Sequence, residues 1–187
     1  RFDYFSDYKK LFDDSLDFVL IAATAKNHYF IVKDFLEHGI NVICEKPLAE
    51  TYMDVNQLYA IAHKKNVKLI SIYHWQYTDE VQWLEKYRRQ LGKIKRIDLK
   101  IHDPYASKNG INIVEDRVGM MGAVLDEFPN AFSLVDVILP LNESEDFKIK
   151  KKRSIIDPNC GYEICCDVEI IYKGIPVNIS VDWRKNL

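Results

Sequence analysis

Glycine is scarce in this chain, and the scarcity bears directly on nucleotide binding. Only 7 of its 187 residues are glycine, and nowhere do they follow the spacing G-x-G-x-x-G. That spacing lets backbone N–H groups and a helix N-terminus approach a pyrophosphate. The sequence therefore contains no phosphate-binding loop of the usual dinucleotide type.

Long apolar runs, excess charge and metal-type cysteine spacing are missing as well. No apolar stretch approaches the roughly 20 residues of a membrane span, and the first residues do not resemble a signal peptide, so we expect no membrane partner. A formal net charge of −2 argues against a general nucleic-acid-binding surface. The cysteines, Cys44, Cys160, Cys165 and Cys166, lack zinc-ligand spacing. Reduced thiols in a cytoplasmic protein are their simplest explanation.

The first half of the chain alternates short apolar runs with amphipathic helices. Residues 17–23, 42–44 and 67–72 have the composition of buried strands, and residues 24–38 and 51–66 follow the helical period. Strands that alternate with helices are typical of parallel sheets. The pattern predicts an α/β fold with a doubly wound parallel sheet.

The second half has a different pattern, in which apolar and polar residues alternate along the strands. We expect a helix over residues 78–91 and strands over residues 94–101, 166–172 and 175–183. The last two strands are joined at Lys173-Gly174, which predicts an antiparallel hairpin. Each strand has one apolar face that helices must cover, and residues 129–139 are the best candidate for the covering helix. The expected fold is an α+β domain with an open, largely antiparallel sheet.

The tripeptide Glu45-Lys46-Pro47 stands where an apolar run stops. Sites in α/β sheets lie at such carboxyl ends of strands. Pro47 restricts the backbone of the residue before it, so Lys46 is held in a defined direction. On the tripeptide alone, an ordinary surface Lys-Pro turn explains the residues equally well.

Three segments together resemble the Gfo/Idh/MocA family of oxidoreductases. They are residues 17–24 with Asn27-His28, the tripeptide Glu45-Lys46-Pro47, and residues 122–126 followed by Asn130. The resemblance implies that residues 1–76 are the C-terminal part of a Rossmann-type dinucleotide-binding domain. Residues 77–187 would then be a family-type C-terminal α/β domain, itself incomplete. It also implies hydride transfer between NAD or NADP and a hydroxyl carbon of a sugar, sugar nucleotide or cyclitol.

The resemblance begins partway into the family's nucleotide-binding domain. Residues 1–4 resemble the family's third strand and the segment after it. We therefore expect that the first strand, the phosphate loop and the acidic residue that binds the ribose are missing from this piece. The choice between NAD and NADP stays open, because that acidic residue would lie upstream.

The resemblance assigns roles to individual residues. The expected cofactor-binding residues are Thr24, Asn27, His28, Glu45, Lys46 and Pro47. The expected substrate-binding residues are Lys46, His74, Gln76, Asp126 and Asn130. Among these, Lys46, Asp126 and Asn130 are the expected catalytic residues. No metal site is expected.

Two departures from the family pattern leave the catalytic base open. Asn130 stands at the position of the family's histidine, and an amide cannot accept a proton at physiological pH. Gln76-Tyr77 replaces the Arg-Phe of many relatives, which makes recognition of a carboxylate or phosphate there less favourable. The base is then Lys46, or Asp126 with Asn130 orienting hydroxyls, or His74, or the site has lost its chemistry.

Two function classes remain, together with a simpler third reading. The first is an NAD(P)-dependent oxidoreductase that acts on a small carbohydrate or cyclitol, and the second is a non-catalytic relative that binds dinucleotide or sugar. In the third, this piece has no activity of its own. The sequence leaves open the sugar and the carbon that reacts. We also expect a homo-oligomer that associates through the C-terminal sheet.

Overall fold

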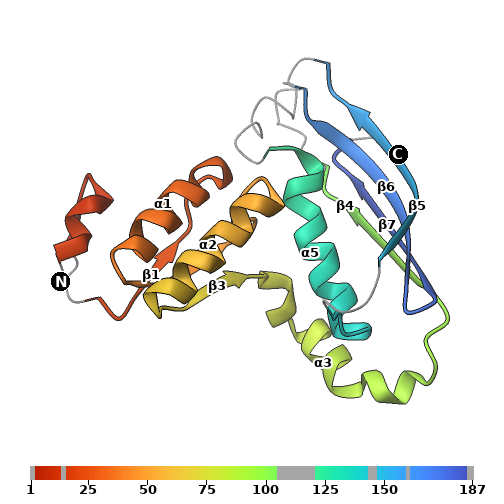
Figure 1. Cartoon of the computed structure of the whole chain (residues 1–187). Coiled ribbons are helices and arrows are strands. Elements are labelled where there is room, and N and C mark those ends of the chain that lie inside the picture. The colour runs from red at the N-terminus through yellow and green to blue at the C-terminus, as the bar shows by residue number, and fades with distance from the viewer. Residues whose placement is uncertain (1–2, 14–15, 105–120, 143–146, 159–160, 185–187) are drawn as a thin grey trace. The chain divides into compact units, whose positions relative to one another are not determined.

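The computed structural model describes residues 3–13, 16–104, 121–142, 147–158 and 161–184. The chain divides into two compact units, Arg1–Ile72 and Tyr73–Leu187. Each unit contains one β-sheet with helices packed against it (Figure 1). The expected α/β class is confirmed.

The first unit is built on a three-stranded parallel sheet in the order β1-β2-β3. Its elements are the 3-10 helix η1 (Tyr8–Asp13), β1 (Phe18–Ile21), α1 (Ala25–Glu37), β2 (Asn41–Glu45), α2 (Tyr52–Lys65) and β3 (Leu69–Ile72). Every strand pair is parallel, because a helix crosses over between successive strands. The predicted parallel sheet is confirmed. Strands β1 and β3 are shorter than their apolar runs, whereas β2 extends one residue beyond its run at each end.

Local signals set the ends of the two helices. The Thr51 side chain caps α2 by accepting a hydrogen bond from the backbone N–H of Asp54 at 3.1 Å. Asn66 ends α2 in the left-handed conformation, with φ 56°, and Gly39 follows α1 with φ 79°. Thr24 occupies the position before α1, yet its hydroxyl oxygen accepts from the Asn27 side-chain amide instead of a helix N–H.

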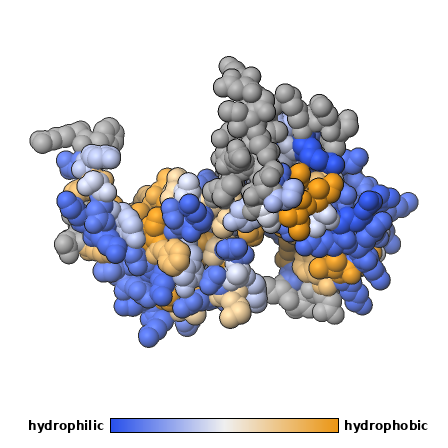
Figure 2. All heavy atoms as spheres, turned by 90° about the horizontal axis from the view of Figure 1, so that it is seen from above, coloured by the Kyte–Doolittle hydropathy of each residue, from blue (hydrophilic) through white to orange (hydrophobic). Residues whose placement is uncertain are grey.

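Helices α1 and α2 cover the same face of this sheet (Figure 1). Val32, Leu36 and Leu58 from the helices pack in one core with strand residues, among them Val42 and Cys44. Along the strands, alternate side chains point to the opposite face. On that face Phe18, Leu20 and Ile70 are 50% to 58% exposed. Apolar patches also appear among hydrophilic side chains on the surface of both units (Figure 2).

The second unit contains a four-stranded sheet in the order β4-β7-β6-β5. Its elements are η2 (His74–Tyr77), α3 (Asp79–Tyr87), η3 (Arg88–Leu91), β4 (Ile97–His102), α5 (Gly122–Ile138), β5 (Lys148–Ile156), β6 (Glu163–Tyr172) and β7 (Ile175–Asp182). Strands β5, β6 and β7 are antiparallel neighbours, whereas β4 runs parallel to β7. The expected open, largely antiparallel sheet and its hairpin turn at Lys173-Gly174 are confirmed.

One helix, α5, covers the apolar face of this sheet (Figure 1). Ala131 and Val135 pack against Ile170 and Ile179, which alternate with polar residues along their strands. The segment expected to cover this face, residues 129–139, lies in α5 except for its last residue, but the helix begins earlier, at Gly122, and continues through Pro129. Proline removes only one helical hydrogen bond, and burial of the helix against the sheet offsets that loss.

Gly122 allows α5 to begin close to strand β6. Its φ is 93°, in the region that side chains rarely adopt. A Cβ atom at this position would lie 3.1 Å from Tyr162 Cβ and 3.2 Å from the Glu163 carbonyl oxygen. The start of α5, and with it the residues of its first turns, therefore depends on a glycine here.

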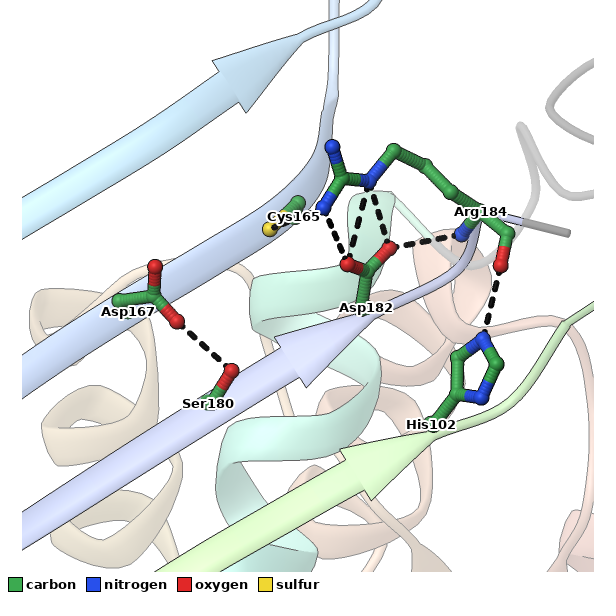
Figure 3. A network of polar contacts seen from close by, with 6 residues as sticks. All are labelled: His102, Cys165, Asp167, Ser180, Asp182 and Arg184. Carbon is green, nitrogen blue, oxygen red and sulfur yellow. Dashed lines mark hydrogen bonds and ion pairs between the residues drawn. The ribbon is translucent and has the colours of Figure 1, made fainter. Parts of the chain in front are cut away.

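A polar network closes one end of the second sheet (Figure 3). Arg184 Nε donates to both carboxylate oxygens of Asp182, at 2.9 and 3.1 Å, and the Arg184 carbonyl oxygen lies 2.8 Å from His102 Nε2. Burial raises the pKa of the Asp182 carboxyl, but the hydrogen bonds from Arg184 outweigh that effect and the pKa is lowered overall. Burial also raises the pKa of the neighbouring Cys165 thiol to about 11. The opposite charges of Asp182 and Arg184 attract each other, and this attraction stabilises the end of the sheet.

We expect Gly122→Ala to lower the free energy of unfolding by about 1–3 kcal/mol, because it adds a steric contact to an unfavourable φ. Gly174→Ala is the matched control, since Gly174 also has positive φ but would place its Cβ in open space. Urea denaturation of both variants measures the difference. Equal losses in the two variants would show that the contact with β6 is unimportant.

The Asp182–Arg184 pair predicts a pH-dependent contribution to stability. A carboxyl whose pKa is lowered by folding stabilises the protein above its unfolded pKa, about 4, and loses that contribution as the pH falls further. Asp182→Asn should therefore cost about 1 kcal/mol at pH 7, a modest value because Arg184 is partly exposed. Urea denaturation at pH 7, 5 and 3.5 should show the difference from the parent shrinking only at the lowest pH. A difference that is constant across this range would contradict the assignment.

Candidate functional site

The carboxyl end of the first sheet gathers all six residues expected to bind the cofactor. Thr24 and Asn27 lie exposed at the start of α1, and Asn27 Nδ2 donates to Thr24 Oγ1 at 2.9 Å. Glu45 is the last residue of β2, and Lys46 follows it, with both side chains half-buried. The peptide between Lys46 and the buried Pro47 is cis. An exposed helix start beside a lysine and a carboxylate can bind a polar ligand at this edge.

His28 joins two strand ends beneath this edge. Its side chain is buried, with Nδ1 2.7 Å from the Pro47 carbonyl oxygen and Nε2 2.9 Å from the Ala23 carbonyl oxygen. Both ring nitrogens are therefore engaged by backbone that follows β2 and β1. The geometry gives His28 the role of fixing the backbone next to Lys46, and its expected contact with the cofactor stays a prediction.

Cys44 lies in the same strand as Glu45 but takes no part in the edge. Its side chain is fully buried in the core of the first unit. Burial, with a smaller contribution from the Glu45 carboxylate, raises the pKa of the Cys44 thiol to about 12. The thiol stays protonated at neutral pH and is no nucleophile.

In the second unit, helix α5 carries Asp126 and Asn130 together. They are four residues apart and therefore lie on the same side of the helix. Only 7% of Asp126 and 2% of Asn130 is exposed. The Ser133 hydroxyl donates to the Asn130 carbonyl oxygen at 2.7 Å. The pair expected from the sequence thus shares one helix face, although Pro129 lies between its members.

Glu127 is a buried polar residue at this site that the sequence prediction missed. It is 3% exposed, and its carboxylate accepts a long hydrogen bond of 3.4 Å from Asn130 Nδ2. The spacing of three residues between Glu127 and Asn130 was the available signal, since such residues are neighbours on a helix. The site on α5 therefore contains two carboxylates and an amide.

The segment η2 places the two remaining predicted substrate residues differently. His74 is exposed and makes an edge-on ring contact with Trp75. Gln76 is half-buried, and its Nε2 donates to the Ser133 carbonyl oxygen on α5 at 3.3 Å. Gln76 thus fixes η2 against the helix that carries Asp126, whereas His74 is left accessible.

Metal binding and membrane insertion find no support in the described part of the chain. Within it, no three His, Cys, Asp or Glu side chains gather as a possible metal site. None of its helices combines the length and the apolar character needed to cross a membrane.

Comparison with known proteins identifies relatives of both units. Over 126 residues the chain is 30% identical to trans-1,2-dihydrobenzene-1,2-diol dehydrogenase of Xenopus laevis, covering 65% of this chain and 37% of that protein. Over 113 residues it is 28% identical to D-apiose dehydrogenase of Paraburkholderia graminis, covering 55% of this chain and 30% of that protein. An inositol dehydrogenase homolog of Azotobacter vinelandii, solved with NADH and myo-inositol, has a similar fold, with a TM-score of 0.78 at 22% identity.

The chain spans only part of the length of these relatives. The match to the inositol dehydrogenase homolog covers 96% of this chain but 49% of that one, so the chain spans about half of this solved structure and about a third of the two dehydrogenases. Residues 1–74 match the model of an oxidoreductase family with an NAD-binding Rossmann fold. The resemblance expected from the sequence is confirmed over residues 1–74, which match the model of the Gfo/Idh/MocA oxidoreductase family.

Proposed function

We propose that the protein is an NAD(P)-dependent oxidoreductase that transfers hydride between a nicotinamide cofactor and a hydroxyl carbon of a sugar, sugar nucleotide or cyclitol. Residues 1–76 would bind the cofactor, and residues 77–187 would supply the substrate site. The observation that carries the proposal is the edge at Glu45-Lys46-Pro47. There a lysine follows a parallel strand, and His28 holds the adjoining backbone.

The residues present fit one end of the cofactor. Thr24 and Asn27 are accessible polar groups at a helix start that follows β1, and Lys46 follows the neighbouring strand β2. Polar groups at this edge suit the nicotinamide and its ribose. No segment of the 187 residues has the glycine spacing for the pyrophosphate. When bound, the nicotinamide would accept or supply the hydride.

The exposed apolar face of the first sheet supports a larger cofactor domain. Parallel sheets are normally covered on both faces, yet Phe18, Leu20 and Ile70 lie open opposite α1 and α2. Among the described strands, β1 also lies at one edge of the sheet. We propose that further strands and helices of a dinucleotide-binding domain pack on this face and edge.

The chain's own residues would bind the substrate and move the hydroxyl proton. Asp126 and Asn130 would hold hydroxyl groups of the substrate, because both side chains accept hydrogen bonds. Either the Lys46 amine or the Asp126 carboxylate would take the proton from the reacting hydroxyl. The backbone contacts of His28 would keep Lys46 in place during this transfer.

A second candidate function is binding without catalysis. Asn130 occupies the family's histidine position, and an amide cannot act as a base. Gln76 is engaged with the backbone of α5. A protein that binds a dinucleotide or sugar as a sensor would have these features. If the unmutated protein shows no turnover, the binding function is favoured.

We also propose that the open face of the second sheet pairs with the same face of a second copy. The register places Arg153 opposite Asp167 and Lys151 opposite Glu169, so a basic column on β5 runs beside an acidic column on β6. When two such faces meet with an offset of one strand, opposite charges face each other. The apolar face is already covered by α5.

Lys46→Met tests the enzymatic proposal. The change keeps the length of the side chain but removes its charge and hydrogen bonds, so we expect kcat to fall by about a hundredfold or more. Lys46→Arg should not restore it, because guanidinium is planar and does not give up its proton. Turnover is measured with NAD and NADP over a panel of sugars and cyclitols.

Lys64→Met is the control, since Lys64 is exposed on α2 and away from the edge. Thermal unfolding of all three variants should match the parent, which shows that lost turnover is not lost folding. Full turnover in Lys46→Met would rule out the catalytic role of this lysine.

Charge reversal tests the proposed association. Replacing Asp167 and Glu169 together by arginine makes the column on β6 basic like its neighbour on β5, so we expect two copies to repel and the oligomer to dissociate. Light scattering across a wide concentration range measures the mass, and Glu50→Arg in an exposed loop is the control. A parent protein that stays monomeric at every concentration would refute the association.

A further inference from the structure

The pair Glu127 and Asn130 is unusual because both side chains are polar and almost fully buried. They are 3% and 2% exposed, and they lie three residues apart on α5. Burying a carboxylate is costly unless it accepts hydrogen bonds, and the Asn130 amide supplies one of them at 3.4 Å. The buried Glu127 carboxylate therefore holds the Asn130 amide through this hydrogen bond.

The contact determines which way the Asn130 amide faces. A carboxylate oxygen only accepts hydrogen bonds, so the amide must turn its Nδ2 toward Glu127. Its Oδ1 then points away from the carboxylate. In the described part of the chain, this buried oxygen has no hydrogen-bond partner. A buried carbonyl oxygen without a donor costs about 1–3 kcal/mol, so the position favours a ligand that brings a donor.

We infer that Glu127 is a positioning residue that orients the Asn130 amide so that its Oδ1 accepts a hydrogen bond from a hydroxyl group of the ligand. The inference rests on the proposed function for its ligand class. Asp126, on the same side of the helix, is a further acceptor, so a ligand with neighbouring hydroxyl groups matches the pair. Without Glu127, the amide can rotate by half a turn and present Nδ2 to the ligand. The hydroxyl would then have to accept a hydrogen bond instead of donating one, and the fixed Oδ1 acceptor would be lost.

Two substitutions of Glu127 separate orientation from packing. Glu127→Met keeps the bulk but removes the acceptor, whereas Glu127→Gln keeps an acceptor of nearly the same shape. Glu80→Met, at an exposed position on α3, is the matched control. The Asn130 side-chain amide is observed by ¹H–¹⁵N NMR of the full chain and is assigned by its loss in Asn130→Ala.

We expect the Asn130 amide protons to exchange slowly in the parent, in Glu127→Gln and in Glu80→Met. In Glu127→Met they should shift and exchange faster. A titration with myo-inositol, a polyol probe, is followed in the same spectra. Loss of one hydrogen bond predicts about tenfold weaker binding in Glu127→Met. Binding in Glu127→Gln should stay within about threefold of the parent, a rescue that packing alone would not produce.

The outcomes distinguish this inference from the proposed function. The positioning role is wrong if the shift and exchange rate of the Asn130 amide protons are unchanged in Glu127→Met. It is also wrong if the parent binds myo-inositol and Glu127→Met binds it equally tightly. If the amide responds as expected but the parent binds no polyol, the orienting role of Glu127 is supported and the proposed substrate class is contradicted.

Discussion

The second unit depends on one constraint: among its described helices, α5 alone must both pack on the apolar face of the four-stranded sheet and carry the polar site. Ala131 and Val135 pack on the sheet, while Asp126, Glu127 and Asn130 are buried with them along the same helix. The helix can hold both sets only if its start is fixed, and Gly122 fixes it against β6. The position of the site therefore follows from the packing of the sheet.

A comparable dependence holds at the edge of the first sheet. Lys46 owes its fixed backbone to its place after β2 and to His28, whose ring contacts the carbonyl groups of Pro47 and Ala23. The two contacts tie the end of β2 to the end of β1. Parallel strands bring their carboxyl ends to one edge, and a buried side chain joins those ends there.

The two units differ in how their polar groups are satisfied. At the first edge, Thr24 and Asn27 are exposed and form a hydrogen bond to each other. A ligand that replaces this hydrogen bond would therefore lose little free energy. On α5, the polar groups are buried, and Asn130 Oδ1 is without a partner in the described residues. Burial makes a hydrogen bond there more selective, because an unmatched ligand leaves polar groups without partners. The proposed roles follow this difference: general binding at the first edge and discrimination between ligands on α5.

Much of this architecture was accessible from the amino-acid sequence. The parallel sheet, the stop signals at Gly39 and Asn66, the alternation along β4, β6 and β7, and the hairpin turn at Lys173-Gly174 all follow from local patterns. Local patterns suffice there because each strand or turn is defined by neighbouring residues.

Other features were decided only by tertiary structure. The sequence indicated residues 129–139 as the covering helix, since proline is unfavourable inside a helix, but the helix begins seven residues earlier, at Gly122, and packs against the sheet. The sequence indicated Lys46 and Asp126 as site residues, yet it showed neither the engagement of both His28 nitrogens nor the buried pairing of Glu127 with Asn130. Burial and hydrogen-bond direction depend on residues that are distant in the chain, and these become neighbours only when the sheet and its helix pack together.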